Sequence, residues 1–219
     1  MPTYSDLNGL AEQHGATLVA VSKTKPVAAI RELYDLGHRD FGENYVQELV
    51  AKRAELPDDI RWHYIGHLQR NKVKDIAPFV HLVHGVDSLR LLREIDKRGR
   101  AIGRIVEVLL QVHVAEEDTK HGFSPEELLA LFEADDVHRL AWVRPSGIMG
   151  MTTHTDDAAQ RAREFSALRR VYDEIAERFY ARRPDWSTLS MGMSGDYEQA
   201  LAEGSNCLRI GSLLFGPRD

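Results

Sequence analysis

Lys23 is the residue whose type and position best suit covalent chemistry in this sequence. It follows the apolar run Leu18-Val-Ala-Val21, which is typical of a buried strand, so its amine is expected at the mouth of a sheet or barrel. Partial burial and a nearby cation such as Lys25 would lower the pKa of this amine and let it form a Schiff base with a carbonyl compound. Position alone leaves an alternative, because many strands end in a lysine that points to solvent.

Two segments near the C-terminus combine glycine with serine, as phosphate-binding turns do. They are Met191-Gly-Met-Ser-Gly195 and Ile210-Gly-Ser212. Glycine lets backbone N–H groups approach an anion, and the hydroxyls of Ser194 and Ser212 can add hydrogen bonds. One such segment alone would be explained as a tight turn. Two of them, after the last two strands of a barrel, favour a phosphate site, because barrels often bind phosphate there.

Arg209, Asn44 and His63 are further candidates for the same site. Arg209 lies within an apolar run, where an arginine is costly unless it faces a polar cavity or a partner. We expect it to contact a ligand, and an ion pair with an acid such as Glu43 across the barrel mouth is the alternative. Asn44 ends a strand-like run, so it falls at the same mouth. His63 is either a core histidine bonded to backbone or a residue of the site.

Several common kinds of site are not expected. There is no His-Glu-x-x-His motif, nucleophile elbow, Gly-Lys-Ser/Thr phosphate loop or dinucleotide fingerprint. His81 and His84 are three apart in a strand-like run and should face opposite ways, so no metal site is predicted. A formal net charge of −6 argues against a nucleic-acid partner, and no apolar run reaches the ~18 residues of a membrane span. One cysteine, Cys207, and an N-terminus unlike a leader predict a cytoplasmic protein.

The elements expected to carry these residues alternate along the chain from Thr17 to the C-terminus. Short β-branched or aromatic runs predict eight strands, at 17–23, 39–43, 61–66, 82–86, 104–114, 140–149, 188–193 and 207–211. Helices are expected to begin near Pro26, Tyr45, Gln69, Ser88, Ser124, Asp156 and Asp196. Eight strand–helix repeats in 219 residues favour an α/β fold with a single (β/α)₈ TIM barrel over an open sheet. Residues 1–219 are therefore predicted to form one domain.

Five ordered motifs resemble those of the YggS/PROSC family of pyridoxal phosphate homeostasis proteins. They are Ala20-Val-Ser-Lys-Thr-Lys-Pro26, Phe41-Gly-Glu-Asn-Tyr-Val-Gln-Glu48, Trp62-His-Tyr-Ile-Gly66 with Leu68-Gln69 and Asn71-Lys72, Leu189-Ser-Met-Gly-Met-Ser194, and Arg209-Ile-Gly-Ser212 with Phe215-Gly216. The resemblance runs from near Ala16 to the C-terminus. It implies a barrel of the alanine racemase N-terminal type that binds pyridoxal 5′-phosphate (PLP).

The resemblance also implies which residues hold PLP. The cofactor would form a Schiff base with Lys23, and its phosphate would lie against Ser194, Gly211 and Ser212, with Met193 in the same motif. These assignments agree with the chemistry expected of the strand-end lysine and of the two glycine–serine segments.

Other residues take less direct roles by the same resemblance. Arg209 would face the pyridine nitrogen, and a cation there disfavours protonation of that nitrogen and so weakens PLP as an electron sink. Asn44 and His63 fall in motifs that line the pocket. Lys120, in Glu117-Asp-Thr-Lys-His-Gly122, resembles a loop lysine of the family that is near the cofactor.

The function implied by the resemblance is to carry PLP and to regulate its free level within vitamin B6 homeostasis. In related racemases a second domain brings a tyrosine base to the opposite face of PLP, and this sequence ends at Asp219 without one. We therefore expect a PLP-binding protein without robust catalysis, which hands PLP to apo-enzymes and acts as a monomer. A PLP-dependent amino-acid racemase is the alternative, and an aldolase-type barrel with a lysine imine and no cofactor is another.

Two segments depart from the family pattern. The chain before Thr17 is expected to be too short for the family's N-terminal helix. Met151-Thr-Thr-His-Thr-Asp156 stands where the family has a more apolar loop. Both departures could alter access to the pocket, and neither touches the lysine or phosphate motifs.

Overall fold

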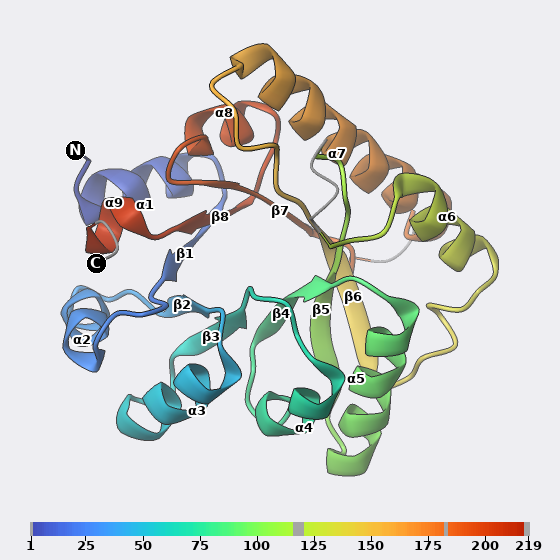
Figure 1. Ribbon diagram of the computed structural model, residues 1–219, viewed down its shortest axis with the longest axis horizontal. Helices are drawn as coiled ribbons and strands as arrows, with labels where there is room; N and C mark the ends of the chain where they lie inside the picture. Colours follow the sequence, from blue (N-terminus) through green and yellow to red (C-terminus); the bar gives the residue numbers. More distant parts are fainter. Residues whose placement is uncertain (1, 116–120, 182–183, 217–219) are drawn as a thin grey trace.

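Eight parallel strands close into a barrel in the computed structural model, which describes residues 2–115, 121–181 and 184–216 (Figure 1). Each strand pairs with the next in the chain and β8 pairs with β1, so the sheet has no free edge. The strands are β1 (Thr17–Val21), β2 (Asp40–Glu43), β3 (Arg61–Tyr64), β4 (Leu82–Val86), β5 (Val106–Gln111), β6 (Val143–Met149), β7 (Thr188–Met193) and β8 (Cys207–Ile210). The predicted barrel and its eight strands are confirmed, although several predicted strands are too long.

Helices surround the barrel and cover its outer face (Figure 1). They are α1 (Tyr4–Gln13), α2 (Val27–Asp35), α3 (Val46–Glu55), the 3₁₀ turn η1 (Arg70–Lys72) with α4 (Val73–Ile76), α5 (Leu89–Ile102), α6 (Pro125–Glu133), α7 (Ala158–Phe179), α8 (Tyr197–Ala202) and α9 (Ser212–Phe215). The seven predicted helix starts are confirmed to within two residues. In the described part of the chain, no helix combines the length and the apolar character needed to span a bilayer.

Capping residues set several helix ends. The Ser124 hydroxyl accepts a hydrogen bond from the Glu127 N–H (3.1 Å), and the Glu127 side chain accepts one from the Ser124 N–H (2.9 Å), which starts α6 with a capping box. Asp157 starts α7 by accepting from two backbone N–H groups. Gly37 follows the end of α2 with φ of +96°, a conformation that glycine adopts without strain.

The prediction that the chain is too short before β1 for a helix is wrong. Helix α1 begins with a capping box in which Thr3 accepts from the Asp6 N–H (3.3 Å) and Asp6 accepts from the Thr3 N–H (2.8 Å). Leu7 and Ala11, one turn apart, are buried and anchor the helix to the core. The spacing of Thr3 and Asp6 is the signal in the sequence that indicates this helix start.

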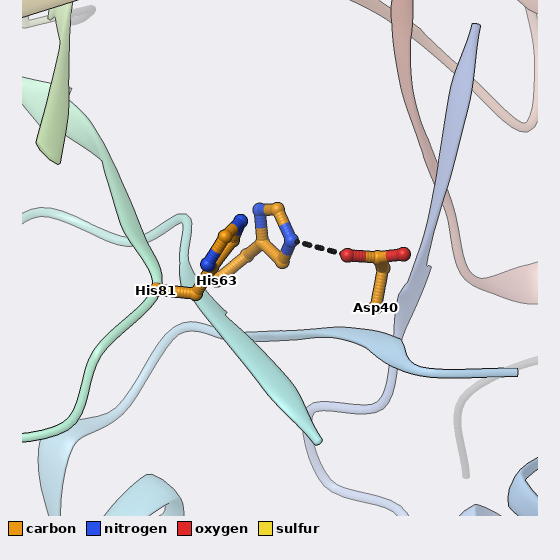
Figure 2. A group of neighbouring side chains, drawn as sticks. All are labelled: Asp40, His63 and His81. Carbon is orange, nitrogen blue, oxygen red and sulfur yellow. Dashed lines mark hydrogen bonds and ion pairs between the residues drawn. The ribbon is translucent and has the colours of Figure 1, made fainter. Parts of the chain in front are cut away.

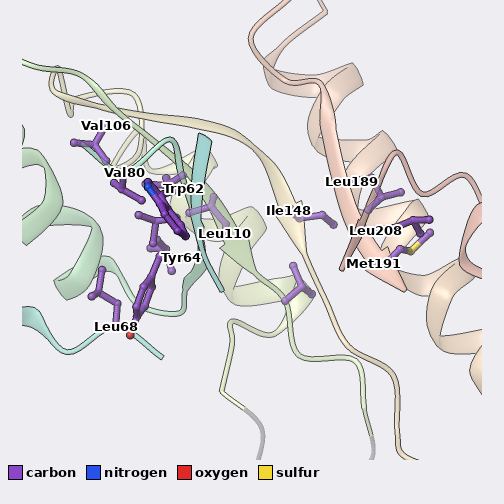
Figure 3. Close-up of a cluster of buried hydrophobic side chains, with 14 of the residues drawn as sticks. Trp62, Tyr64, Leu68, Val80, Val106, Leu110, Ile148, Leu189, Met191 and Leu208 are labelled. Carbon is purple, nitrogen blue, oxygen red and sulfur yellow. The ribbon is translucent and has the colours of Figure 1, made fainter. Parts of the chain in front are cut away.

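The main hydrophobic core lies between the barrel wall and the helices (Figure 3). Alternate residues of β3, β7 and β8 belong to it, namely Trp62, Tyr64, Leu189, Met191 and Leu208. Because successive side chains of a strand point to opposite faces, the residues between these positions face the barrel interior. The apolar cluster formed separately by Leu82, Leu109 and Met149 is much smaller. The inner face of the barrel is therefore free to carry polar residues.

Candidate functional site

The C-terminal ends of the strands bring most of the predicted site residues to one mouth of the barrel. Val21 of β1 is level with Gly42 of β2, so Lys23 and Asn44 each lie two residues beyond a paired position. On its other side β1 pairs with β8, which leads directly into Gly211. Strand β1, which leads into Lys23, therefore lies between β2, which leads into Asn44, and β8, which leads into Gly211. Lys23 itself is half-buried.

A buried charge cluster holds the turn that carries Lys23. The Ser22 hydroxyl donates to Glu43 Oε1 (2.6 Å). The Lys52 ammonium donates to the same oxygen and to the Ser22 carbonyl, both at 2.7 Å. Burial raises the pKa of Glu43, although Lys52 and Ser22 act to lower it. The residue before Lys23 is thus fixed through both its backbone and its side chain.

The residue after Lys23 is fixed as well. Thr24 has φ of +64°, which is strained for a residue other than glycine. Its N–H donates to Glu48 Oε1 (2.6 Å), and Glu48 forms an ion pair with Lys52 (2.7 Å). A strained backbone conformation of this kind persists only where several surrounding contacts hold the residue in place. The cluster around Lys52 therefore sets the direction in which the Lys23 side chain leaves the strand.

Ser194, Gly211 and Ser212 lie in two loops that contact each other. The Gly211 N–H donates to Ser194 Oγ (3.2 Å). Gly192 has φ of +91°, and a Cβ there would lie 2.5 Å from a side chain of α8, so only glycine fits. A Cβ on Gly195, by contrast, would have no atom within 4 Å. These loops thus combine close packing beneath them with open space at their surface, as an anion site requires.

Asn44 presents a buried acceptor toward this mouth. Its Oδ1 has no hydrogen-bond partner among the described residues, although buried polar atoms almost always have one. A cavity of about 360 Å³ lies beside it, lined in part by Tyr64, Gly66 and Lys72. A Cβ on Gly66 would lie 2.3 Å from the Asn44 carbonyl oxygen, so glycine permits this close approach. Asn44 is therefore placed to accept a hydrogen bond from a ligand.

The loop after β6 is tied to the same mouth. Within Met151–Asp156, the Thr152 hydroxyl donates to Asp196 Oδ2 (3.2 Å), and the Thr153 N–H donates to Glu164 of α7 (2.6 Å). Asp196 also accepts from the N–H of Met193 (2.6 Å), whose side chain is exposed. This loop is thereby linked to the β7 loop. The predicted site residue Lys120 lies outside the described residues.

Arg209 is buried inside the barrel, below the mouth. Its guanidinium donates to Ser190 Oγ (2.6 Å) and to the Gly150 carbonyl (3.0 Å). Burial lowers the pKa of this guanidinium. Within the described residues no ion pair joins Arg209 to an acidic side chain, and the carboxylate of Glu43 pairs with Lys52 instead. Of the two interpretations of Arg209, the contact with a ligand is the one that stays open.

His63 lies deeper in the barrel than the other predicted residues. Its Nε2 is 3.0 Å from Asp40 Oδ1 (Figure 2), and its Nδ1 is 2.9 Å from His84 Nε2. His84 Nδ1 in turn lies 3.1 Å from Ser190 Oγ, which is the partner of Arg209. His63 therefore contacts side chains with both nitrogens and is linked to Arg209 through two residues.

The N-terminal mouth of the barrel holds a second cavity, of about 430 Å³, lined in part by Asp40, Arg61, His63 and His81. Ligand atoms of Asp40, His63 and His81 lie within 4.8 Å of one another, as in a metal site. Both Asp40 oxygens already accept hydrogen bonds from the cationic Arg61, which would compete with a metal ion. A second group with metal-like spacing consists of His67, Asp87 and His121. The absence of a metal site stays a prediction.

His81 and His84 do not separate as their spacing suggested. Both rings lie 5.2 Å from the ring of His63. His81 precedes the first residue of β4 and so does not follow the alternation of that strand.

Sequence reasoning missed four residues that support the site: Asp40, Lys52, His84 and Ser190. The signal for His84 and Ser190 is a polar residue inside an apolar strand. The signal for Lys52 is its helical spacing of four from Glu48. None of these signals says which partner the residue meets, because that depends on strand register.

Acid should destabilise the protein through His84. Burial lowers the pKa of this ring well below its usual value, and the nearby positive charge of Arg209 adds to the shift. In the unfolded protein this ring has a pKa of about 6.5. The stabilising contribution of the neutral, buried ring is therefore complete above that pH and is lost as the pH falls below it. His84→Gln should reduce the slope of unfolding free energy against pH by about 1.4 kcal/mol per unit between about pH 6 and 5. Urea unfolding of both proteins measures this, and equal slopes would contradict it.

Comparison with known proteins adds an independent finding. Residues 4–219 match the family described as alanine racemase, N-terminal domain. A pyridoxal phosphate homeostasis protein of Pseudomonas aeruginosa is 43% identical over 203 residues, which cover 92% of this chain and 84% of that protein. The protein of the same name from Escherichia coli is 38% identical over 207 residues, covering 93% and 86%.

Solved structures agree with these relatives. PipY of Synechococcus elongatus with PLP bound aligns with a TM-score of 0.84 and 36% identity, covering 96% of this chain and 98% of that one. An alanine racemase of Streptomyces coelicolor aligns with a TM-score of 0.76 and 19% identity, covering 95% of this chain and 56% of that one. The second likeness concerns the fold alone.

Proposed function

Because this chain belongs to the family of pyridoxal phosphate homeostasis proteins, and its residues 4–219 match the alanine racemase N-terminal domain, we propose that it binds PLP as a Schiff base on Lys23. Its function is to take part in the homeostasis of this form of vitamin B6. The observation that carries the proposal is the arrangement at the C-terminal mouth, where the strand ends lead into a lysine, a buried amide acceptor and two touching glycine–serine loops.

The residues at this mouth fit the chemical parts of PLP. Open space at Gly195 and the hydroxyls of Ser194 and Ser212 suit a phosphate group. The unsatisfied Oδ1 of Asn44 suits a hydrogen-bond donor on a ligand. We assign Arg209 to the ring nitrogen, and Met193, which precedes the phosphate serine, to the rim of the site.

PLP supplies an aldehyde that condenses with amines and an aromatic ring that can withdraw electrons. The chain's own residues restrain the second property. The Arg209 guanidinium stays charged and does not transfer a proton to the ring nitrogen. Its positive charge also disfavours protonation of that nitrogen. We therefore propose that the protein holds and releases PLP without robust catalysis. The likeness to alanine racemases lies at or below 19% identity and supports no racemase assignment.

Apo-enzymes that require PLP are the proposed recipients. Because Lys23 is only half-buried and lies at the C-terminal mouth, it can exchange PLP with another amine without unfolding of the barrel. We further propose that residues 1–219 act as one barrel domain, as a monomer and in the cytoplasm, as the sequence predicted.

Titration of the purified protein with PLP should produce the visible absorbance of a Schiff base. Borohydride reduction should then fix the mass of reduced PLP on the peptide that contains Lys23, because only a covalent imine is reducible to a stable amine. Peptide mass mapping makes the measurement. A reduced label on a different lysine would exclude Lys23 as the anchor, and a protein that takes up no PLP would exclude the function.

A further inference from the structure

Arg209 is a buried cation whose described partners are neutral. Its residue exposure is 4%, and it donates only to the Ser190 hydroxyl and the Gly150 carbonyl among the described residues. A charge taken out of water is costly unless polar partners replace its hydration. The stabilisation of this guanidinium therefore depends on how well those two acceptors are presented.

A chain of hydrogen bonds leads from Arg209 through the barrel to the carboxylate of Asp40. Ser190 Oγ lies 3.1 Å from His84 Nδ1, and His84 Nε2 lies 2.9 Å from His63 Nδ1. The chain ends where His63 Nε2 lies 3.0 Å from Asp40 Oδ1 (Figure 2). It joins strands β8, β7, β4, β3 and β2, and it crosses the interior of the barrel between its two mouths.

The chemistry of the end groups determines which atom donates and which accepts at each hydrogen bond between Arg209 and Asp40. Burial acts to raise the pKa of Asp40, but hydrogen bonds from Arg61 and His63 outweigh it and hold that pKa well below its usual range. The carboxylate can then only accept, so His63 Nε2 carries a proton. In a neutral His63 ring, Nδ1 accepts, and its partner is the Nε2–H of His84. The lowered pKa keeps His84 neutral, so its Nδ1 accepts the Ser190 hydroxyl proton.

We propose that Asp40, His63 and His84 are positioning residues for Arg209. With the Ser190 proton committed to His84, the lone pairs of Ser190 Oγ are left to accept from the guanidinium. Hydrogen bonds in such a chain polarise one another, so the charge of Asp40 stabilises Arg209 from a distance. The inference rests on the proposed function, in which Arg209 must stand opposite the ring nitrogen of PLP.

The first test needs no PLP. In the wild-type protein labelled with ¹⁵N-histidine, NMR should show His63 and His84 as neutral rings, each with its proton on Nε2. A cationic His63, or a proton on Nδ1 of either ring, would overturn the proposal. Because this measurement uses the PLP-free chain, it separates failure of the hydrogen-bond chain from failure of PLP binding.

The second test compares three substitutions. His63→Phe keeps a ring of similar shape but removes both hydrogen bonds, whereas His63→Gln keeps one donor and one acceptor. His81→Phe is the matched control, since its ring lies at the same distance of 5.2 Å from His63 as that of His84 but outside the chain. In His63→Phe alone, the Arg209 guanidinium N–H signals should exchange faster with solvent, and PLP should bind about tenfold more weakly.

The pattern across the variants decides the matter. The proposal is supported if His63→Gln and His81→Phe keep the wild-type N–H exchange rate of Arg209 and the wild-type PLP affinity, while His63→Phe shows faster exchange and weaker binding. The proposal would be overturned by equal exchange rates and equal PLP affinities in all three variants. It would also be overturned if His63→Gln lost as much PLP affinity as His63→Phe. If His63→Phe does not fold, the ring protonation in the wild-type protein still decides for or against the chain.

Discussion

Lys23→Ala should abolish the visible Schiff-base absorbance of the PLP-loaded protein and leave no label after borohydride reduction. The side chain that supplies the amine is removed, while the phosphate loops and Arg209 remain. Residual non-covalent binding is expected, weakened by about a hundredfold or more, which corresponds to ~2.7 kcal/mol. Equilibrium dialysis gives the affinity, and absorbance gives the covalent state.

A lysine elsewhere on the surface serves as the control for this substitution. Lys97 is exposed on α5 and touches none of the proposed site, so Lys97→Ala should retain both the absorbance and the affinity. A reducible imine that persists in Lys23→Ala at full occupancy would show that another amine anchors PLP. Loss of binding in both variants would show that the effect is not specific to Lys23.

Lys52→Met should destabilise the protein by about 3–5 kcal/mol, because it leaves the carboxylate of Glu43 buried without its cation. Lys52 and Glu43 are 5% and 0% exposed, and the distance between Lys52 Nζ and Glu43 Oε1 is 2.7 Å. Urea unfolding of the PLP-free protein measures the loss. Since the same ammonium holds the Ser22 carbonyl, the variant should also hold the Lys23 turn less firmly and bind PLP more weakly.

The double variant separates charge from packing. In Lys52→Met with Glu43→Gln, the fully buried carboxylate is neutralised, and the partly buried Glu48 keeps its hydrogen bond from the Thr24 N–H, so much of the lost stability should return. PLP affinity should remain low in the double variant, because the hydrogen bond to the Ser22 carbonyl is still missing. A single variant within about 1 kcal/mol of wild type would mean that this ion pair is not needed for stability.

The barrel could be predicted because its signals are local. Runs of apolar residues located all eight strands, and caps such as Ser124 and glycines such as Gly37 located helix ends. Strand ends were less accurate: the predicted strand 104–114 contains β5 at Val106–Gln111, since apolar residues continue past the last ladder pair. The first helix was missed although Thr3 and Asp6 form its capping box.

The site could be predicted only in part, for a physical reason. Lys23, Asn44 and Gly211 follow strand ends, and parallel strands bring their ends together whatever the register. Contacts inside the barrel depend on which residues of neighbouring strands are level. The pairing of Phe41 with Trp62 that places Asp40 and His63 on the same face is a property of the assembled sheet. The link from His63 to Arg209 is thus visible only in three dimensions.

The alternation along β3, β7 and β8 has a consequence for how such a barrel can change during evolution. Each of these strands carries two interleaved sets of residues: one set packs outward against the helices, and the other faces the polar interior. Selection for folding acts mainly on the first set and selection for the ligand mainly on the second. A lineage can therefore alter its inner residues one at a time and acquire a different ligand, while the outer residues preserve the scaffold.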